Sequence, residues 1–93
     1  MTENQRQFPR KEVEIEVVLS FLEDSARTVI TRDVSEGGLF MRIKDTAHYP
    51  MGEMVNLRYK NPLDSFKDTE KDAIVVRQTD DGIAVAFVEM GDF

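Results

Sequence analysis

RTVITRDVSEGGLFMRIK, residues 27–44, holds two strand patterns around a polar centre. Its first part is rich in β-branched side chains, and after the centre Leu39, Met41 and Ile43 alternate with other side chains, as in a half-buried strand. The centre, DVSEGG (33–38), supplies an aspartate, a serine and two glycines. A tight turn needs no more than one glycine, with or without an aspartate. The stretch therefore predicts two strands joined by a turn whose residues have a second use.

The two-residue period continues on both sides of this stretch. Residues 12–22, EVEIEVVLSFL, place apolar side chains on one face and glutamates on the other, which predicts a strand that pairs with residues 27–34 as a hairpin. Asp81-Gly82 is a strong hairpin signal nearer the C-terminus. The predicted strands are residues 12–22, 27–34, 39–44, 54–60, 73–79 and 83–89. Residues 61–72, NPLDSFKDTEKD, predict a loop or a distorted strand start.

Six short strands separated by turn signals, and no stretch with a convincing helical period, predict an all-β fold. The expected architecture is a small antiparallel barrel or sandwich. At 93 residues the chain is long enough for one small domain. Residues 1–11 lie outside the strand pattern and predict a flexible polar arm, which leaves residues 12–93 for the β-domain.

Composition excludes several classes of protein. The chain has no cysteine, so it can neither form disulfides nor use thiolate catalysis. Its longest apolar run, IAVAFV at residues 83–88, is far shorter than the roughly 20 residues that span a bilayer. The net charge of −6 opposes binding to long nucleic acids, because such binding is favoured by a basic protein surface. We therefore expect a soluble cytoplasmic protein that does not insert into membranes.

Two short motifs carry the functional prediction. RQFPR (6–10) holds two arginines four positions apart, and the proline inside it opposes an ordinary helix. Asp33-x-Ser35-x-x-Gly38 follows after one predicted hairpin. Each motif alone is common, but their combination in this order is far more specific. The excess of basic over acidic side chains in residues 1–11 favours a local anion site on the arm.

The pair of motifs resembles the signature of the PilZ family, which binds the bacterial second messenger cyclic di-GMP. RxxxR matches residues 6–10, and [D/N]xSxxG matches residues 33–38. GGLFMR, MGEMVNLRY and DGIAVAF are weaker similarities further along, so the resemblance covers nearly the whole chain. It implies a six-stranded antiparallel β-barrel, the PilZ-like split barrel, whose N-terminal arm folds over the mouth where the second motif lies.

The side chains of both motifs suit a ligand that contains phosphates and guanines. An arginine fork matches guanine O6 and N7 or a phosphate, and Asp33 can accept from guanine N1–H and N2–H₂. Ser35 can donate to a phosphate oxygen, and Gly37 and Gly38 are expected to adopt positive φ angles and let the ligand approach the backbone. The predicted binding residues are Arg6, Arg10, Asp33, Ser35, Gly37 and Gly38, with Gln5 and Lys11 as additional candidates. No metal and no cofactor besides this ligand is expected.

By the same resemblance, the residue before RxxxR influences whether one ligand or an intercalated pair binds. Gln5 occupies that position, and its uncharged side chain does not offset the phosphates of a pair. This favours one cyclic di-GMP per chain, with the intercalated pair as the alternative.

Simpler interpretations compete with this one. The two arginines could be solvated charges on an arm, and Asp33 and Ser35 could cap a turn through hydrogen bonds to the backbone. An OB-like single-strand nucleic-acid binder would use aromatic residues on a basic groove, which suits a less acidic chain. An enzyme is not expected, because the lone histidine, His48, has no catalytic motif around it and no Gly-rich phosphate loop precedes a lysine.

The principal alternative is a PilZ-like adaptor that binds a protein and not the nucleotide. On either interpretation a small domain of this kind acts on another molecule, so an unidentified effector protein is an expected partner. The resemblance implies control of motility, exopolysaccharide production or a related behaviour through that partner, after a change in arm conformation on ligand binding.

Overall fold

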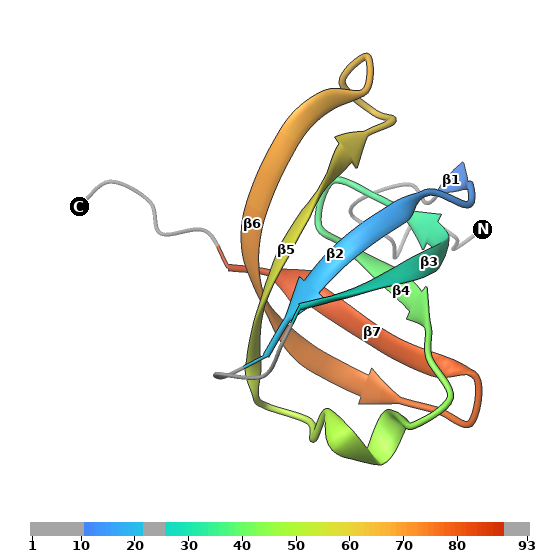
Figure 1. Cartoon of the computed structure of the whole chain (residues 1–93), viewed down its shortest axis with the longest axis vertical. Helices are drawn as coiled ribbons and strands as arrows, with labels where there is room; N and C mark the ends of the chain where they lie inside the picture. Colours follow the sequence, from blue (N-terminus) through green and yellow to red (C-terminus); the bar gives the residue numbers. More distant parts are fainter. Residues whose placement is uncertain (1–10, 22–25, 89–93) are drawn as a thin grey trace, which may run out of the picture.

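The computed structural model describes residues 11–21 and 26–88, and these residues form a small β-domain (Figure 1). The strands are β1 (Lys11–Glu12), β2 (Glu16–Ser20), β3 (Arg27–Val34), β4 (Gly38–Arg42), β5 (Met54–Asn61), β6 (Lys67–Gln78) and β7 (Gly82–Phe87). A short 3₁₀ turn, Thr46–His48, lies between β4 and β5. Within the described residues no helix has the length and apolar character that a membrane crossing requires.

Six of these strands close into an antiparallel barrel. Around the barrel the order is β3-β2-β5-β6-β7-β4, and β4 pairs with β3 to complete the circle. β1 pairs with β3 and adds a seventh strand outside this circle. The predicted six-stranded antiparallel barrel is therefore confirmed, and the sandwich alternative is not. Closure gives every barrel strand two neighbours.

The apolar positions of the two-residue period fill the barrel interior. Val17 and Leu19 of β2 face inward, and Leu39 and Met41 of β4 do the same. The buried core comprises Val17, Leu19, Phe21, Val29, Val34, Leu39, Met41, Ile43, Tyr49, Val55, Leu57, Tyr59, Ala73, Val75, Ile83 and Val85. The alternation that predicts the strands thus also predicts their inner faces.

β2 starts later than the sequence predicts. The predicted strand 12–22 is divided into β1 and β2 by an interruption at residues 13–15. Thr31 of β3 is fully buried there, and its hydroxyl donates to Val13 O at 2.6 Å and accepts from Ile15 N at 3.0 Å. Because the threonine side chain takes these backbone bonds, the ladder is interrupted, and the preceding residues pair with the far end of β3.

The hairpin between β5 and β6 occupies the polar segment 61–72, for which the sequence predicts a loop or a distorted strand start. The predicted loop is wrong for residues 67–72, because β6 begins at Lys67 and pairs with β5 in regular register. Lys60 Nζ on β5 lies 2.6 Å from Asp68 Oδ1 on β6, and further polar pairs follow along the two strands. These cross-strand pairs let charged side chains occupy a strand that intrinsic propensity disfavours.

Candidate functional site

β3 contains a bulge directly before the DVSEGG segment. Thr31 pairs with Met41 of β4, and the next pair is Asp33 with Phe40, so Arg32 is an extra residue with no opposite partner. Two residues of one strand thus face a single residue of the other, which is the definition of a β-bulge. Bulges bend a strand and redirect the side chains that follow them.

The bulge determines where the Asp33 carboxylate lies. Val29 and Thr31 are both buried on the inner face of β3, so a regular strand would point Asp33 inward as well. After the bulge the core position belongs to Val34, which is fully buried, and the neighbouring Asp33 faces outward. An unpaired carboxylate inside an apolar barrel would be strongly destabilising. The extra residue therefore makes this aspartate compatible with the fold.

Asp33 forms a small polar cluster with Arg32 and Phe40 on the outside of the barrel. Arg32 Nε donates to Asp33 Oδ2 at 3.1 Å. The Arg32 guanidinium carbon lies 3.9 Å from the centroid of the Phe40 ring, a cation–π contact. Phe40 lies between the inward-facing Leu39 and Met41, so its ring is on the outer face, where it is still only 4% exposed.

The Ser35 side chain closes the turn between β3 and β4. Ser35 N donates to Gly38 O at 2.8 Å, and its Oγ donates to the same oxygen at 3.1 Å. Gly37 N donates to Ser35 Oγ at 3.2 Å, and Gly37 O accepts from Phe87 N at 2.9 Å. The hydroxyl that the sequence assigns to a ligand phosphate thus caps the turn in this structure.

Gly38 of the motif allows close strand packing, and neither motif glycine has a left-handed backbone conformation. Among the described residues Gly52 is the one glycine with positive φ, so the positive φ expected at Gly37 and Gly38 is wrong. A Cβ at Gly38 would overlap the carbonyl oxygen of Val85 on β7. Gly38 is required because two strands approach closely, a reason that depends on β7 and not on the turn alone.

A second turn repeats these hydrogen bonds. Thr79 N donates to Gly82 O at 2.9 Å, Thr79 Oγ1 donates to the same oxygen at 3.3 Å, and Asp81 N donates to Thr79 Oγ1 at 3.1 Å. A Cβ at Gly82 would overlap Met41 O, as one at Gly38 overlaps a carbonyl of β7. The Thr79 turn joins β6 to β7, as the Asp81-Gly82 signal predicts. The Ser-x-x-Gly part of the second motif therefore has a structural equivalent in Thr79-x-x-Gly82, and both form the turn of a hairpin.

β1 brings the chain next to RxxxR against the second motif. Lys11 pairs with Val34, and Glu12 pairs with Asp33. Lys11, which the sequence assigns to the arm, belongs to this exposed strand. The other arm candidates lie outside the described residues: Gln5, Arg6 and Arg10.

Arg32 and Phe40 are the residues of this surface that the sequence prediction missed. A signal for them is present in the sequence. Strict alternation from Val29 and Thr31 predicts Asp33 inside the barrel, and a charged residue at an inward position indicates a change of register.

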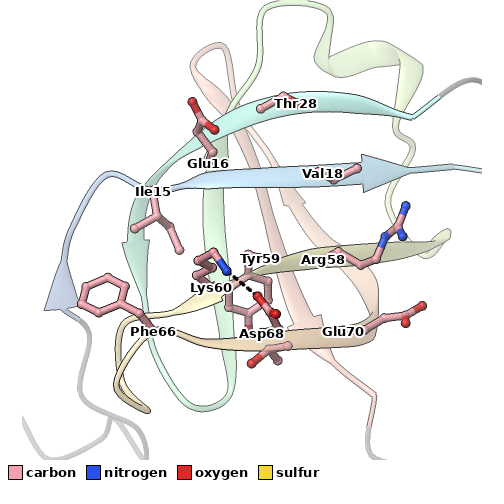
Figure 2. A pocket seen from close by; sticks show the side chains of 11 residues that line it. Ile15, Glu16, Val18, Thr28, Arg58, Tyr59, Lys60, Phe66, Asp68 and Glu70 are labelled. Carbon is pink, nitrogen blue, oxygen red and sulfur yellow. Dashed lines mark hydrogen bonds and ion pairs between the residues drawn. The ribbon is translucent and has the colours of Figure 1, made fainter.

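A separate groove of about 770 Å³ lies on the outer face of β2, β5 and β6 (Figure 2). Ile15 and Phe66 provide part of its apolar lining, and the Lys60–Asp68 ion pair crosses it. The hydrogen bond from Lys60 lowers the pKa of Asp68, and burial raises the pKa of Tyr59, also in the lining, to about 12. No described residue of the two motifs lines this groove.

Comparison with known families covers nearly the whole chain. A family model described as PilZ domain matches residues 4–92. The match includes both RQFPR and DVSEGG. No curated protein matches the chain.

Proposed function

Because this chain belongs to the PilZ domain family, we propose that it is a receptor for cyclic di-GMP. PilZ domains are known as cyclic di-GMP receptor domains, and the family is one of binding and adaptor domains and not of catalysts. The observation that carries the proposal is the pairing of β1 with the end of β3, which ties the chain next to RxxxR to the residues of DVSEGG.

Chain connectivity supports one site formed by both motifs. Arg10 directly precedes Lys11, so covalent geometry keeps its Cα about 3.8 Å from that of a residue paired with Val34. Arg6 is four residues further back, within about 14 Å of Arg10 even in a fully extended chain. Cyclic di-GMP carries two phosphates and two guanines, so it can contact two arginines and a carboxylate at once.

Each motif residue has a role in the proposed complex. Asp33 accepts hydrogen bonds from the N–H groups of a guanine, and Arg6 and Arg10 bind phosphate or the O6 and N7 atoms of a guanine. Ser35 and Gly38 act by fixing the turn after Asp33, because the hydroxyl proton of Ser35 is already donated to Gly38 O. Two further residues complete the site: Gly37 through its backbone in the same turn, and Lys11 through its charge at the foot of the arm.

The proposed output is a change in the arm that an effector protein detects. Ligand contacts to Arg6 and Arg10 would hold the arm against the barrel beside β1. A partner that recognises this arrangement would then respond to the second messenger. Control of motility, exopolysaccharide production or a related behaviour is the output that PilZ membership favours.

Calorimetric titration of the full chain with cyclic di-GMP tests the proposal, with GTP as the control. We expect saturable binding of one cyclic di-GMP per chain and much weaker binding of GTP, because a mononucleotide cannot occupy both base contacts. A ratio of two ligands per chain would indicate the intercalated pair. Comparable affinities for the two nucleotides would refute a dedicated receptor, and absence of cyclic di-GMP binding would favour the adaptor that binds only protein.

A further inference from the structure

Arg32 and Phe40 form a layered surface beside Asp33, and neither belongs to the two motifs. Phe40 stacks under the Arg32 guanidinium at 3.9 Å, and Arg32 Nε donates to Asp33 Oδ2 at 3.1 Å. Phe40 in turn lies against β7 at Gly82, where an added Cβ would be 2.9 Å from Phe40 Cε1. The aromatic ring and the carboxylate together hold the guanidinium in one orientation.

These contacts use only part of the Arg32 guanidinium. Arginine carries five N–H donors, and among the described residues its bond to Asp33 is the one that it donates. The Arg32 side chain is 43% exposed, whereas that of Asp33 is 9% exposed. The Nη groups of Arg32 are therefore open to a ligand that reaches Asp33.

The Asp33–Arg32 pair is complementary to one edge of guanine. That edge presents N2–H₂ and N1–H as donors, followed by O6 as an acceptor. A carboxylate accepts from the two donors, and an adjacent guanidinium donates to O6. Adenine presents an acceptor at N1 and a donor at N6, so both protein groups would face the wrong partner.

We propose that Arg32 donates to guanine O6 through its Nη groups and so determines the preference of this site for guanine over adenine. The inference rests on the proposed function, because it requires that Asp33 binds a guanine. Phe40 is a positioning residue that holds the guanidinium beside Asp33. A phosphate is a poorer partner for Arg32, since the phosphates of a nucleotide lie far from the N1–O6 edge that Asp33 binds.

The competing explanation is that Arg32 only neutralises the nearly buried Asp33 carboxylate, because such a charge requires a partner. That role does not depend on which base approaches. It predicts that loss of Arg32 weakens all ligands equally, whereas a contact to O6 predicts a loss confined to bases that carry O6.

Calorimetric titration of the full chain with cyclic di-GMP, cyclic di-IMP and cyclic di-AMP separates the two explanations. Guanine and hypoxanthine share O6 and N1–H, and adenine has neither. Arg32→Met removes the N–H donors of the side chain. Arg32→Lys keeps the positive charge beside Asp33 but not the planar guanidinium. Arg58→Met is the matched control, because Arg58 is an exposed strand arginine that lines the separate groove.

Arg32→Met should weaken binding of cyclic di-GMP and of cyclic di-IMP by roughly tenfold or more. The ratio of either affinity to the affinity for cyclic di-AMP should fall by a similar factor. Arg32→Lys should retain the fold and narrow the same preference, and Arg58→Met should leave all three affinities unchanged. Equal weakening of all three ligands, or an unchanged preference in either Arg32 variant, would overturn the inference. A wild-type chain that binds no cyclic di-GMP would instead refute the proposed function itself.

Discussion

The carboxylate of Asp33 accepts from Arg32 Nε at Oδ2, and no other described residue donates a hydrogen bond to Oδ1. The bulge at Arg32 turns the Asp33 side chain out of the barrel interior, and Asp33 itself pairs with Glu12 of β1. The ligand role proposed for Asp33 thus depends on Arg32, a residue that the motif itself does not specify.

Asp33→Ala should weaken cyclic di-GMP binding at least tenfold, because a hydrogen bond to a charged group contributes about 1.5–3 kcal/mol. Asp33→Asn should be milder, since an amide keeps an acceptor oxygen and the family motif accepts either residue. The fold should survive, because the Asp33 side chain lies outside the core. Calorimetry gives the affinities, and melting temperatures check the fold. An Asp33→Ala protein that binds like the wild type would remove this carboxylate from the site.

Tyr59 provides a test at alkaline pH that is independent of the ligand. Burial raises its pKa to about 12, above the ordinary value near 10, so the folded state holds the hydroxyl proton more tightly than the unfolded chain. Stability should therefore be intact below about pH 10 and decline between about pH 10 and 12, by up to about 2 kcal/mol. Denaturant unfolding at several pH values measures this, and Tyr59→Phe should show a smaller decline. Parallel pH profiles for the two proteins would contradict the expected shift.

Gly38 shows why a residue can be identified from sequence while its reason is missed. Its place in the motif is evident, but the overlap that a Cβ would create is with Val85 O of a strand far along the chain. Local sequence indicates that a glycine is required and does not indicate which strand approaches it. Arg32 and Phe40 escaped prediction for the same reason, because their proximity depends on the register between β3 and β4.

At the scale of elements, the barrel strands follow from the two-residue period because burial on one face imposes it. The interruption at residues 13–15 does not follow from this period, since it depends on the hydroxyl of Thr31 on a different strand. The same holds for β6, whose charged start is stabilised by partners on β5 such as Lys60. Strand identity was thus predictable, whereas bulges, breaks and register required the pairing itself.

Comparison of the two matched turns can separate the structural role of Ser35 from its proposed effect on ligand binding. Ser35→Ala and Thr79→Ala each remove a hydroxyl that donates to a glycine carbonyl and accepts from backbone N–H groups, one at Ser35 and two at Thr79. Each should cost about 1 kcal/mol of stability by denaturant unfolding. Only Ser35→Ala should also weaken cyclic di-GMP binding, because its turn follows Asp33. A Thr79→Ala protein with equally weakened binding would attribute both effects to general destabilisation.

At the scale of the whole molecule, the arm (residues 1–11) has more basic than acidic side chains, whereas the net charge of the chain is −6. An anionic ligand should therefore depend on the arm for its electrostatic attraction. Raising the salt concentration should weaken binding to the wild type more than to Arg10→Ala or Arg6→Ala, because each variant has already lost one screened interaction. Calorimetry at two ionic strengths measures both slopes. Identical salt dependence in all three proteins would exclude the arginines from the site.

β1 is the physical link between the arm and the barrel, since Lys11 and Glu12 pair with Val34 and Asp33. A ligand that binds both motifs should hold the residues before β1 in place, at the cost of their conformational entropy. We therefore expect cyclic di-GMP to slow amide hydrogen exchange across residues 4–11, and GTP to have little effect. Asp33→Ala is the control, because it alters only the barrel half of the site and should abolish the slowing at the same ligand concentration. Exchange across residues 4–11 that is unchanged by saturating ligand would mean that RxxxR and DVSEGG do not act in one site.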